Sequence, residues 1–405
     1  MKKNLPLTQK NSTDKVLRFA QPFYTDVPIG QRPEVSDIGT RMTDYIKTLL
    51  EPIPNPIRDP TMMLAEIIGD QGVAQIQQAG AIKFHAVGDT FSSSGTMQES
   101  IAAAMSADYN PSNAATSPAF FFHLGDVIYY DNTDKGYHEQ FYAPYKTYPG
   151  KIIAIPGNHD GELFKFDGTS TGQKVTLGAF QENFCQPKTG VPPAAGTIYR
   201  EMVSQPAVYW YLNTPFIDVI GLYSNMAENP GYISAPAIGT KQKDWLTKTL
   251  KTISAARAGG KRKALLFATH HPPFSSGAHG SSTEMLIDID DSCTQASIMP
   301  DAFLSAHAHN LQCYTRYLSF GGKDIQIPFI ICGGGGRQIQ HVPAAGGVKV
   351  TDQTTIKSYH TFDKSSYSYG YLTVTATPRK LAIEVYTIQT SGAKTLFDII
   401  ELNLT

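Results

Sequence analysis

The chain has 405 residues and a mass of 44.2 kDa, the length of one large domain with insertions or of two to three smaller domains. Hydrophobic residues make up 41% of it, enough for a sizeable core. Its 34 Lys and Arg residues nearly balance 35 Asp and Glu residues, so the formal net charge is −1. This balance argues against a nucleic-acid platform, which usually shows a basic excess, and against a charge-driven disordered chain. Apolar runs such as 264–268 are far shorter than the ~20 residues of a membrane span, so none is expected.

The N-terminal part differs in pattern from the rest of the chain. Residues 1–35 are largely polar and interrupted by proline, which favours an extended arm. Residues 37–50 and 61–78 carry apolar side chains at helical spacing, with four prolines between them. We therefore expect residues 1–80 to form an arm and helices that pack on a core, and residues 81–405 to form the main catalytic domain.

The terminus and the cysteines bear on the compartment. Two lysines follow Met1, but no apolar segment comes after them, so the chain as it stands is expected to be cytoplasmic. A trimmed mature form of a periplasmic or secreted protein would look the same. The four cysteines are far apart and form no C-x-x-C pair, which predicts buried free thiols rather than a disulfide framework or a zinc site.

From residue 81 onward, short apolar segments each run into polar residues. The segments expected to be strands are 81–87, 119–124, 151–155, 263–268 and 301–305. Short strands that alternate with helical stretches, such as 241–257, predict an α/β fold. The last 80 residues predict antiparallel strands over 325–332, 369–376, 381–388 and 395–402. Because α/β sheets place chemistry at the carboxyl ends of their strands, the polar residues there are candidate site residues.

The side chains at these strand ends have a common chemistry. They include two Asp, one Asn, three His and a Tyr, which are ligands for two adjacent di- or trivalent ions. A carboxylate can bridge two metals, and an Asn oxygen can complete a shell without adding charge. Two-metal sites of this kind clamp the attacking and leaving oxygens of a displacement at phosphorus.

Five sequence blocks carry a resemblance to a known family. They are, in chain order, Gly88-Asp89-Thr90, Gly125-Asp126-Val127-Ile128-Tyr129, Gly157-Asn158-His159-Asp160, Thr269-His270-His271-Pro272 and His307-Ala308-His309-Asn310. With each block placed after a strand, residues 81–402 resemble the calcineurin-like metallophosphoesterases, and within them most closely the purple acid phosphatases. Two positions depart from the pattern of the purple acid phosphatases: Phe91 follows the first block where Gly is usual, and Ala306 precedes the last block where Gly is usual.

The resemblance implies a fold and a ligand set. The fold would be a four-layer α-β-β-α sandwich of two mixed β-sheets flanked by helices. The metal ligands would be Asp89, Tyr129 and His309 for the first metal, Asn158, His270 and His307 for the second, and Asp126 between the two. Ordinary calcineurin-like enzymes have a His at the position of Phe91, and Tyr129 can take the vacant place. A phenolate favours a trivalent ion, so we expect Fe(III) plus a divalent ion (Fe, Zn or Mn).

The activity implied by the resemblance is hydrolysis of a phosphate monoester, with a small phosphorylated substrate as the partner. A hydroxide activated by the metals would attack phosphorus in line. His159 would steady the developing charge, and His279, nine residues after His270, would protonate the leaving group; an ordinary loop position is the alternative for His279. His271 and His123 are expected to be structural.

Two other functions remain open at this point. The first is a phosphodiesterase on the same metal site. The second is a non-catalytic, metal-bearing binding protein whose pocket is blocked by Phe91 and the loop after Asp160. Residues 333–336, four glycines after an expected strand, form either an anion-binding nest of N–H groups or a flexible turn. Nothing in the sequence specifies an oligomeric state.

Overall fold

The structure is a computed structural model that describes residues 50–91, 96–110, 112–165, 167–260, 262–342 and 347–404. The expected arm and almost all of the helix expected over 37–50 lie outside these residues. No helix in the described part of the chain has the length and apolar character needed to cross a membrane. The four cysteines are buried free thiols, as expected.

Two mixed β-sheets form the centre of the molecule. The six-stranded sheet has the order β15-β14-β13-β2-β3-β4. Its strands are β2 (Ile82–Val87), β3 (Pro118–His123), β4 (Lys151–Ala154), β13 (Tyr369–Ala376), β14 (Lys380–Ile388) and β15 (Lys394–Asn403). The first three strands are parallel to one another, and β13 joins them antiparallel to β2.

The nine-stranded sheet has the order β1-β5-β6-β7-β8-β10-β9-β12-β11. Its strands are β1 (Thr61–Met63), β5 (Trp210–Asn213), β6 (Ile217–Leu222), β7 (Ala264–Thr269), β8 (Ala302–Ser305), β9 (Leu311–Phe320), β10 (Lys323–Cys332), β11 (Lys349–Thr351) and β12 (Ser358–Ser366). Strands β6, β7, β8 and β10 run parallel, so their carboxyl ends lie along one edge of the sheet.

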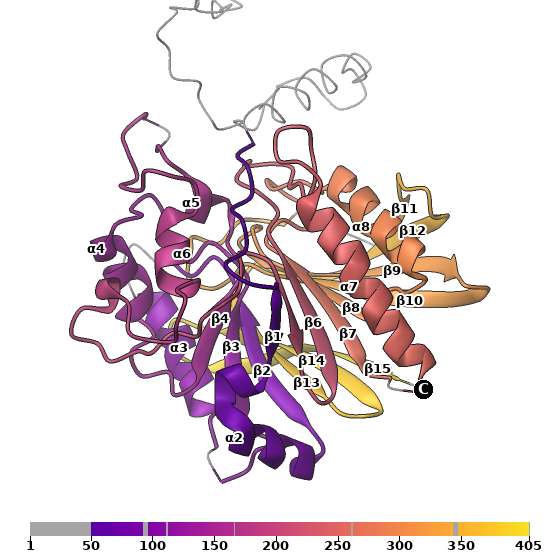
Figure 1. Ribbon diagram of the computed structural model, residues 1–405, viewed down its shortest axis with the longest axis horizontal. Coiled ribbons are helices and arrows are strands. Elements are labelled where there is room, and N and C mark those ends of the chain that lie inside the picture. Colours follow the sequence, from indigo (N-terminus) through magenta and orange to yellow (C-terminus); the bar gives the residue numbers. More distant parts are fainter. Residues whose placement is uncertain are drawn as a thin grey trace, which may run out of the picture.

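Helices cover the outer faces of both sheets, which gives the four layers that were expected (Figure 1). On the nine-stranded sheet lie α7 (Lys241–Ala258) and α8 (Thr283–Ala296), whose buried faces share a cluster with β6, β7, β8 and β10. On the other side, α3 (Thr96–Ala107) contacts β13 and β14. The remaining helices are α2 (Ala65–Ala79), α4 (Asp134–Tyr137), η2 (His138–Tyr142), α5 (Asn158–Gly161), α6 (Gly178–Phe184) and η3 (Pro193–Ala195).

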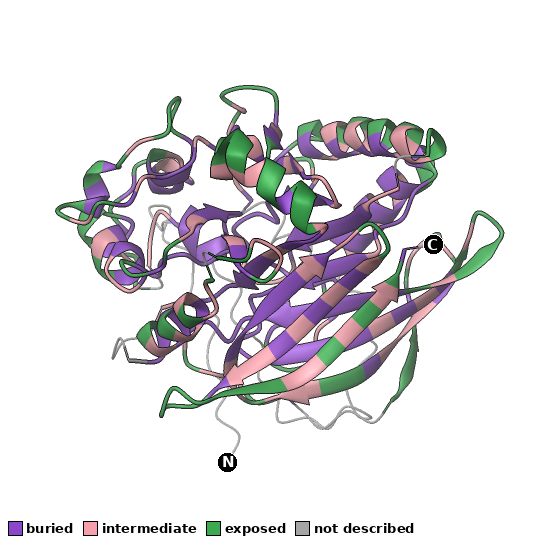
Figure 2. Cartoon of the chain, turned by 90° about the horizontal axis from the view of Figure 1, so that it is seen from below, coloured by how far each residue is buried: buried purple, intermediate pink, exposed green. Residues whose placement is uncertain are grey.

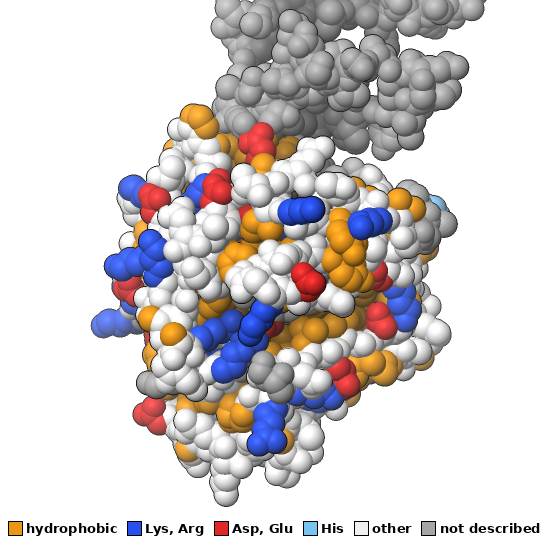
Figure 3. All heavy atoms as spheres, turned by 90° about the vertical axis from the view of Figure 1, so that its right-hand side faces the viewer, with side chains coloured by type: hydrophobic (Ala, Val, Ile, Leu, Met, Phe, Trp, Pro, Cys, Tyr) orange, Lys and Arg blue, Asp and Glu red, His pale blue; other side chains and the backbone are white. Residues whose placement is uncertain are grey.

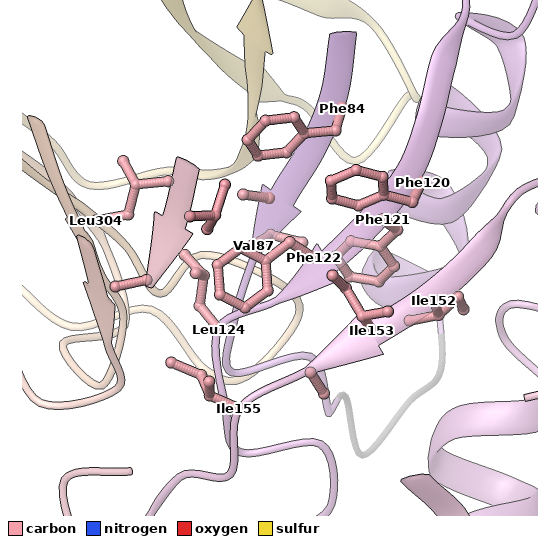
Figure 4. Close-up of a cluster of buried hydrophobic side chains, with 14 of the residues drawn as sticks. Phe84, Val87, Phe120, Phe121, Phe122, Leu124, Ile152, Ile153, Ile155 and Leu304 are labelled. Atoms are coloured by element: carbon pink, nitrogen blue, oxygen red, sulfur yellow. The ribbon is translucent and has the colours of Figure 1, made fainter. Parts of the chain in front are cut away.

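The main core lies between the sheets, where alternating side chains of both meet. Phe84 on β2 and Phe120 on β3 stack with ring centroids 4.8 Å apart, and Leu304 on β8 of the other sheet belongs to the same cluster (Figure 4). Strands β6 and β7 are buried along their whole length, whereas β15 at the sheet edge is largely exposed. Figure 2 shows this contrast between the buried centre and the partly exposed outer strands. The central strands are thus held in the buried core, whereas the edge strand β15 is not.

Most expected elements are confirmed, with boundaries that differ by at most two residues. The clearest difference lies at residues 61–78, which the apolar spacing assigned to a helix. Thr61–Met63 instead forms β1, which pairs parallel with β5, and the helix begins only at Ala65. Met62 is completely buried in this strand, so burial in the sheet overrides the helical pattern. The division into residues 1–80 and 81–405 stays a prediction.

The surface is electrostatically mixed. On the face shown in Figure 3, Lys and Arg side chains are interspersed with Asp and Glu side chains. This agrees with the formal net charge of −1.

Candidate metal centre

Two groups of polar side chains meet where the strands of both sheets end. Asp89 follows β2, and its Oδ1 accepts a hydrogen bond from the Tyr129 hydroxyl at 2.9 Å. Nε2 of His309 lies 3.4 Å from both of these oxygens. The first metal triad predicted from the sequence is therefore brought together, although its members are up to 220 residues apart in the chain.

The second predicted triad is equally compact. Nε2 of His270 lies 3.2 Å from Oδ1 of Asn158 and 3.2 Å from Nδ1 of His307. On its far side, the ring of His270 approaches the carbonyl oxygen of Leu124 through Nδ1 at 3.0 Å. Because that carbonyl can only accept, Nδ1 carries a proton, and Nε2 is the ring nitrogen that faces the other two ligand atoms.

Asp126 lies beside the second triad and offers a free oxygen. Its Oδ1 accepts from the main-chain N–H of His159 at 3.0 Å, while Oδ2 is buried without a hydrogen-bond donor among the described residues. Oδ2 is 3.4 Å from Nε2 of His270, and these two residues and His307 have ligand atoms within 4.8 Å of one another. Burial alone would raise the pKa of Asp126, but His270 and His159 lower it, so the carboxylate is ionised. A buried, ionised oxygen without a donor is what a cation site leaves in a protein without its ions, so these residues fit metal binding.

The backbone is strained at three of these residues. Asp89, Asp126 and His307 have φ values of 56°, 52° and 67°, which side chains with a Cβ adopt at a cost. Such conformations persist only where the surroundings hold them, and they gather at functional sites. Here the positive φ angles occur directly after the strands, where these three side chains join the candidate metal centre.

Close backbone packing enforces this arrangement. A Cβ added at Gly157 would lie 2.8 Å from Cγ of Asp126 and still closer to its Oδ1. At Gly88, an added Cβ would come within 2.5 Å of Cβ of Ala306. The Ala that departs from the family pattern is thus accommodated by the glycine of the first block, and it removes no candidate ligand.

His159 lies next to the centre, and the carboxylate of Glu162 orients its ring. Its Nδ1 is 2.8 Å from Oε1 of Glu162, in an ion pair that lacks the alignment of a hydrogen bond, and its Nε2 is 4.0 Å from Oδ2 of Asp126. Burial alone would lower the pKa of His159, but Glu162 and Asp126 raise it well above its usual value. The imidazole is therefore cationic and faces the space beside Asp126. Its ring packs on Tyr129 and Tyr130 with centroids 4.5 and 5.0 Å away.

His279 also reaches the centre. Its ring centroid is 4.2 Å from that of His307, and Nε2 lies 2.9 Å from the side-chain nitrogen of Gln340. Burial, together with His309 and His271, lowers the pKa of His279 to about 3, so the imidazole is neutral. His279 thus lies at the centre, as expected. To donate a proton the ring must first be protonated, which requires a further negative charge beside it.

Sequence patterns gave no role to several residues that line the centre. Glu228 Oε2 accepts from Nδ2 of Asn158 at 3.2 Å, which orients the amide so that its oxygen faces His270. Asn229 Oδ1 lies 3.3 Å from Nε2 of His307. Both belong to an irregular loop after β6 with no periodicity, so only a chain-wide search for buried polar clusters could have found them.

Asp160 and His271 hold the surrounding loops. The Asp160 carboxylate accepts from the main-chain N–H groups of Gly157 at 2.8 Å and Val127 at 3.2 Å, and so joins the loops after β4 and β3. Nε2 of His271 reaches the carbonyl of Ala227 at 2.7 Å. This contact supports the structural role predicted for His271, because it fixes the loop that carries Glu228.

At two of its positions, the glycine run 333–336 packs closely against other segments of the chain and does not form an anion-binding nest. The N–H groups of Gly333 and Gly335 donate to the carbonyls of Asn310 and Gly88. A Cβ at Gly333 would lie 2.7 Å from Oδ2 of Asp89. These two N–H groups are therefore not available to an anion.

Comparison with known proteins places the chain in a family. The model of the calcineurin-like phosphoesterase family matches residues 82–311, which include both triads and Asp126. No curated protein sequence matches the chain. Among solved structures, PhoD is 11% identical over 87% of this chain and 72% of its own, with a TM-score of 0.47. Vacuolar protein sorting 29 from Cryptosporidium parvum is 11% identical over 80% of this chain and 98% of its own, with a TM-score of 0.31. Because the family model spans more than half of the chain, the chain belongs to the calcineurin-like phosphoesterase family.

Proposed function

We propose that the chain is a dinuclear-metal phosphatase of the purple acid phosphatase kind, which hydrolyses phosphate monoesters. The observation that carries this proposal is the buried Oδ2 of Asp126, which has no hydrogen-bond donor among the described residues and lies 3.4 Å from His270. A carboxylate placed in this way suits a ligand shared by two ions.

The ligand roles follow from the two compact groups. Asp89, Tyr129 and His309 would hold the first ion, and Asn158, His270 and His307 the second, with Asp126 shared between them. The first group offers a carboxylate and a phenol oxygen, which are hard donors suited to Fe(III), and the second suits a divalent ion. The two ions, when bound, polarise the phosphoryl oxygens and make a water molecule acidic enough to serve as the nucleophile of an in-line displacement.

The side chains around these ligands bind and orient the substrate. The cationic ring of His159 is held by Glu162 at 2.8 Å through Nδ1, and its Nε2 would contact the phosphoryl group. His279 lies on the other side, against His307, where it would give a proton to the departing alkoxide. The charge of the phosphate itself supplies the negative partner that protonation of His279 requires.

Metal analysis followed by a paired assay tests the proposal. The purified protein should contain two metal ions per chain and should hydrolyse p-nitrophenyl phosphate faster than bis-p-nitrophenyl phosphate. The opposite preference would favour a phosphodiesterase, and an intact metal content without turnover on a broad panel of phosphate esters would favour a binding protein.

A variant of Asp126 tests the shared ligand. Asp126→Asn should lower the occupancy of both ions and reduce turnover to below about one per cent of wild type, because loss of such a ligand removes several kcal/mol of transition-state stabilisation. Asp70→Asn, on the exposed side of α2, is the matched control and should change neither value. Normal metal content with activity above about one per cent of wild type in Asp126→Asn would contradict the shared role.

A further inference from the structure

Arg337 is a cation at the metal centre that has no carboxylate partner among the described residues. Its guanidinium lies over three aromatic rings, with its central carbon 4.8 Å from the ring centroid of Tyr129, 5.5 Å from that of Tyr130 and 5.7 Å from that of Phe91. Its one side-chain hydrogen bond among these residues runs from Nη2 to the hydroxyl of Tyr130 at 3.2 Å. The side chain is only partly buried, so a ligand can reach it.

The main chain fixes Arg337 next to the first metal triad. Its N–H donates to the carbonyl oxygen of Asp89 at 2.9 Å, and three residues later the N–H of Gln340 donates to that of His309 at 2.8 Å. Gly336, directly before Arg337, has a φ of 141° and would meet the carbonyl oxygen of Thr90 at 2.8 Å if it carried a Cβ. The segment therefore runs along two proposed metal ligands, and main-chain hydrogen bonds hold Arg337 beside them.

The aromatic platform leaves the edge of the guanidinium free. Cation–π attraction to the rings uses none of the five N–H donors of the group. The Tyr130 hydroxyl accepts from one nitrogen, so the other donors point to solvent or to a ligand. A planar, pre-oriented fork of N–H groups matches the spacing of two phosphate oxygens.

We propose that Arg337 binds the phosphoryl group of the substrate and thereby favours dianionic monoesters over monoanionic diesters. This inference rests on the proposed function of the same site. A monoester near neutral pH carries a second ionised oxygen that a diester lacks, so a fixed cation stabilises the monoester more. The inference also gives Phe91 a role, because its ring is one of the three that lie against the guanidinium.

Two variants of Arg337 test the proposal on p-nitrophenyl phosphate and bis-p-nitrophenyl phosphate. Arg337→Ala should lower kcat/KM for the monoester by about 10- to 100-fold, the range for one charge-assisted contact, and that for the diester by less than about threefold. Arg337→Lys keeps the charge without the planar fork and should fall between wild type and Arg337→Ala. Competitive inhibition by orthophosphate should weaken in parallel with the monoester.

Arg379→Ala is the matched control for loss of positive charge. Arg379 lies in the turn between β13 and β14, next to the end of β13 that pairs with the start of β2, and so at the edge away from the metal centre. It should leave both esters unchanged. An equal loss on the two esters in Arg337→Ala, or unchanged inhibition by orthophosphate, would overturn the proposal.

The inference can fail separately from the proposed function. If wild type hydrolyses the monoester but Arg337→Ala retains its ester preference, only the role of Arg337 is wrong. If wild type hydrolyses neither ester, calorimetric titration of the metal-containing protein with orthophosphate still tests whether Arg337 binds phosphate. Weaker binding by at least about tenfold in Arg337→Ala supports the site, and equal binding rejects it.

Discussion

The main-chain N–H of His307 donates a hydrogen bond of 2.7 Å to Oδ2 of Asp89. Asp89 follows β2 of the six-stranded sheet, and His307 follows β8 of the nine-stranded sheet, so this bond ties the two sheets together at the metal centre. Both residues have positive φ angles. With Oδ2 engaged in this way, Oδ1 of Asp89 is left to face Tyr129 and His309. The position of one proposed ligand thus determines the orientation of another on the opposite sheet.

The close packing of Gly157 against Asp126 predicts a sensitive glycine. Gly157→Ala should lower kcat/KM by about 100-fold or more, because the added Cβ would sit 2.8 Å from Cγ of Asp126 and force this carboxylate away. A displacement of about 1 Å is enough for a loss of this size. Metal content should fall with activity.

A second glycine provides the control for this substitution. Gly190→Ala places its Cβ where nothing lies within 4 Å, so activity and metal content should stay close to wild type. If Gly157→Ala also retains full activity, the backbone does not hold Asp126 as tightly as the geometry indicates.

The sequence predicted the parts of the site that lie directly after buried strands. Asp89, Asn158 and His270 each follow an expected strand, which marked them as candidate site residues. The family resemblance grouped them into one ligand set, although β2 and β4 lie in one sheet and β7 in the other. Glu228 and Arg337 could not be found in this way, because they sit in irregular loops whose paths depend on contacts with distant residues. β1 was also missed, since three residues are too few to show a period of two.

Buried charge in the strands was equally invisible to pattern reasoning. Arg316 lies within β9 with almost no exposed surface, and it donates to both oxygens of Asp290 at 2.8 and 2.7 Å and to Asp352 at 2.9 Å. A charged residue in a strand normally marks the solvent face. Here the charge is matched across α8 and the segment before β12, which no local window of sequence contains.

This network predicts a large effect on stability. Arg316→Met should lower the free energy of unfolding by about 3–5 kcal/mol, because it removes the guanidinium that pairs with the buried carboxylates of Asp290 and Asp352. Urea-induced unfolding followed by circular dichroism measures the change. Lys135→Met removes one partner of the exposed pair Lys135–Glu139, whose charged atoms are 3.8 Å apart, and should cost less than about 1 kcal/mol. Equal effects of the two substitutions would show that the Arg316 network adds no stability of its own.

The role proposed for His279 predicts a dependence on the leaving group. His279→Ala should slow alkyl phosphates far more than p-nitrophenyl phosphate, because a good leaving group needs little help from an acid. Steady-state kinetics on a series of alkyl and aryl phosphates measures how the rate depends on the pKa of the leaving group. His341→Ala, an exposed histidine, is the control and should leave the series unchanged. Equal losses on all esters in His279→Ala would assign this residue to binding or to loop structure through Gln340 instead.

The last prediction concerns the identity of the first metal, and it depends on Tyr129. Burial, Asp126 and Asp89 raise the pKa of this phenol well above its usual value, so its ionisation requires a strongly charged cation at its oxygen. A trivalent ion meets this requirement better than a divalent one, and we therefore expect Fe(III) at the first site with a divalent ion at the second. Fe(III) bound to a phenolate should give a visible charge-transfer band and a violet or pink colour, as the likeness to purple acid phosphatases implies. Tyr129→Phe should lose the colour while keeping the fold, because the ring that packs on His159 remains. Tyr130→Phe, which removes a neighbouring hydroxyl bonded to Arg337, should keep the band. A colourless and fully active wild-type protein that contains only divalent metal would rule out the Fe(III)–phenolate site.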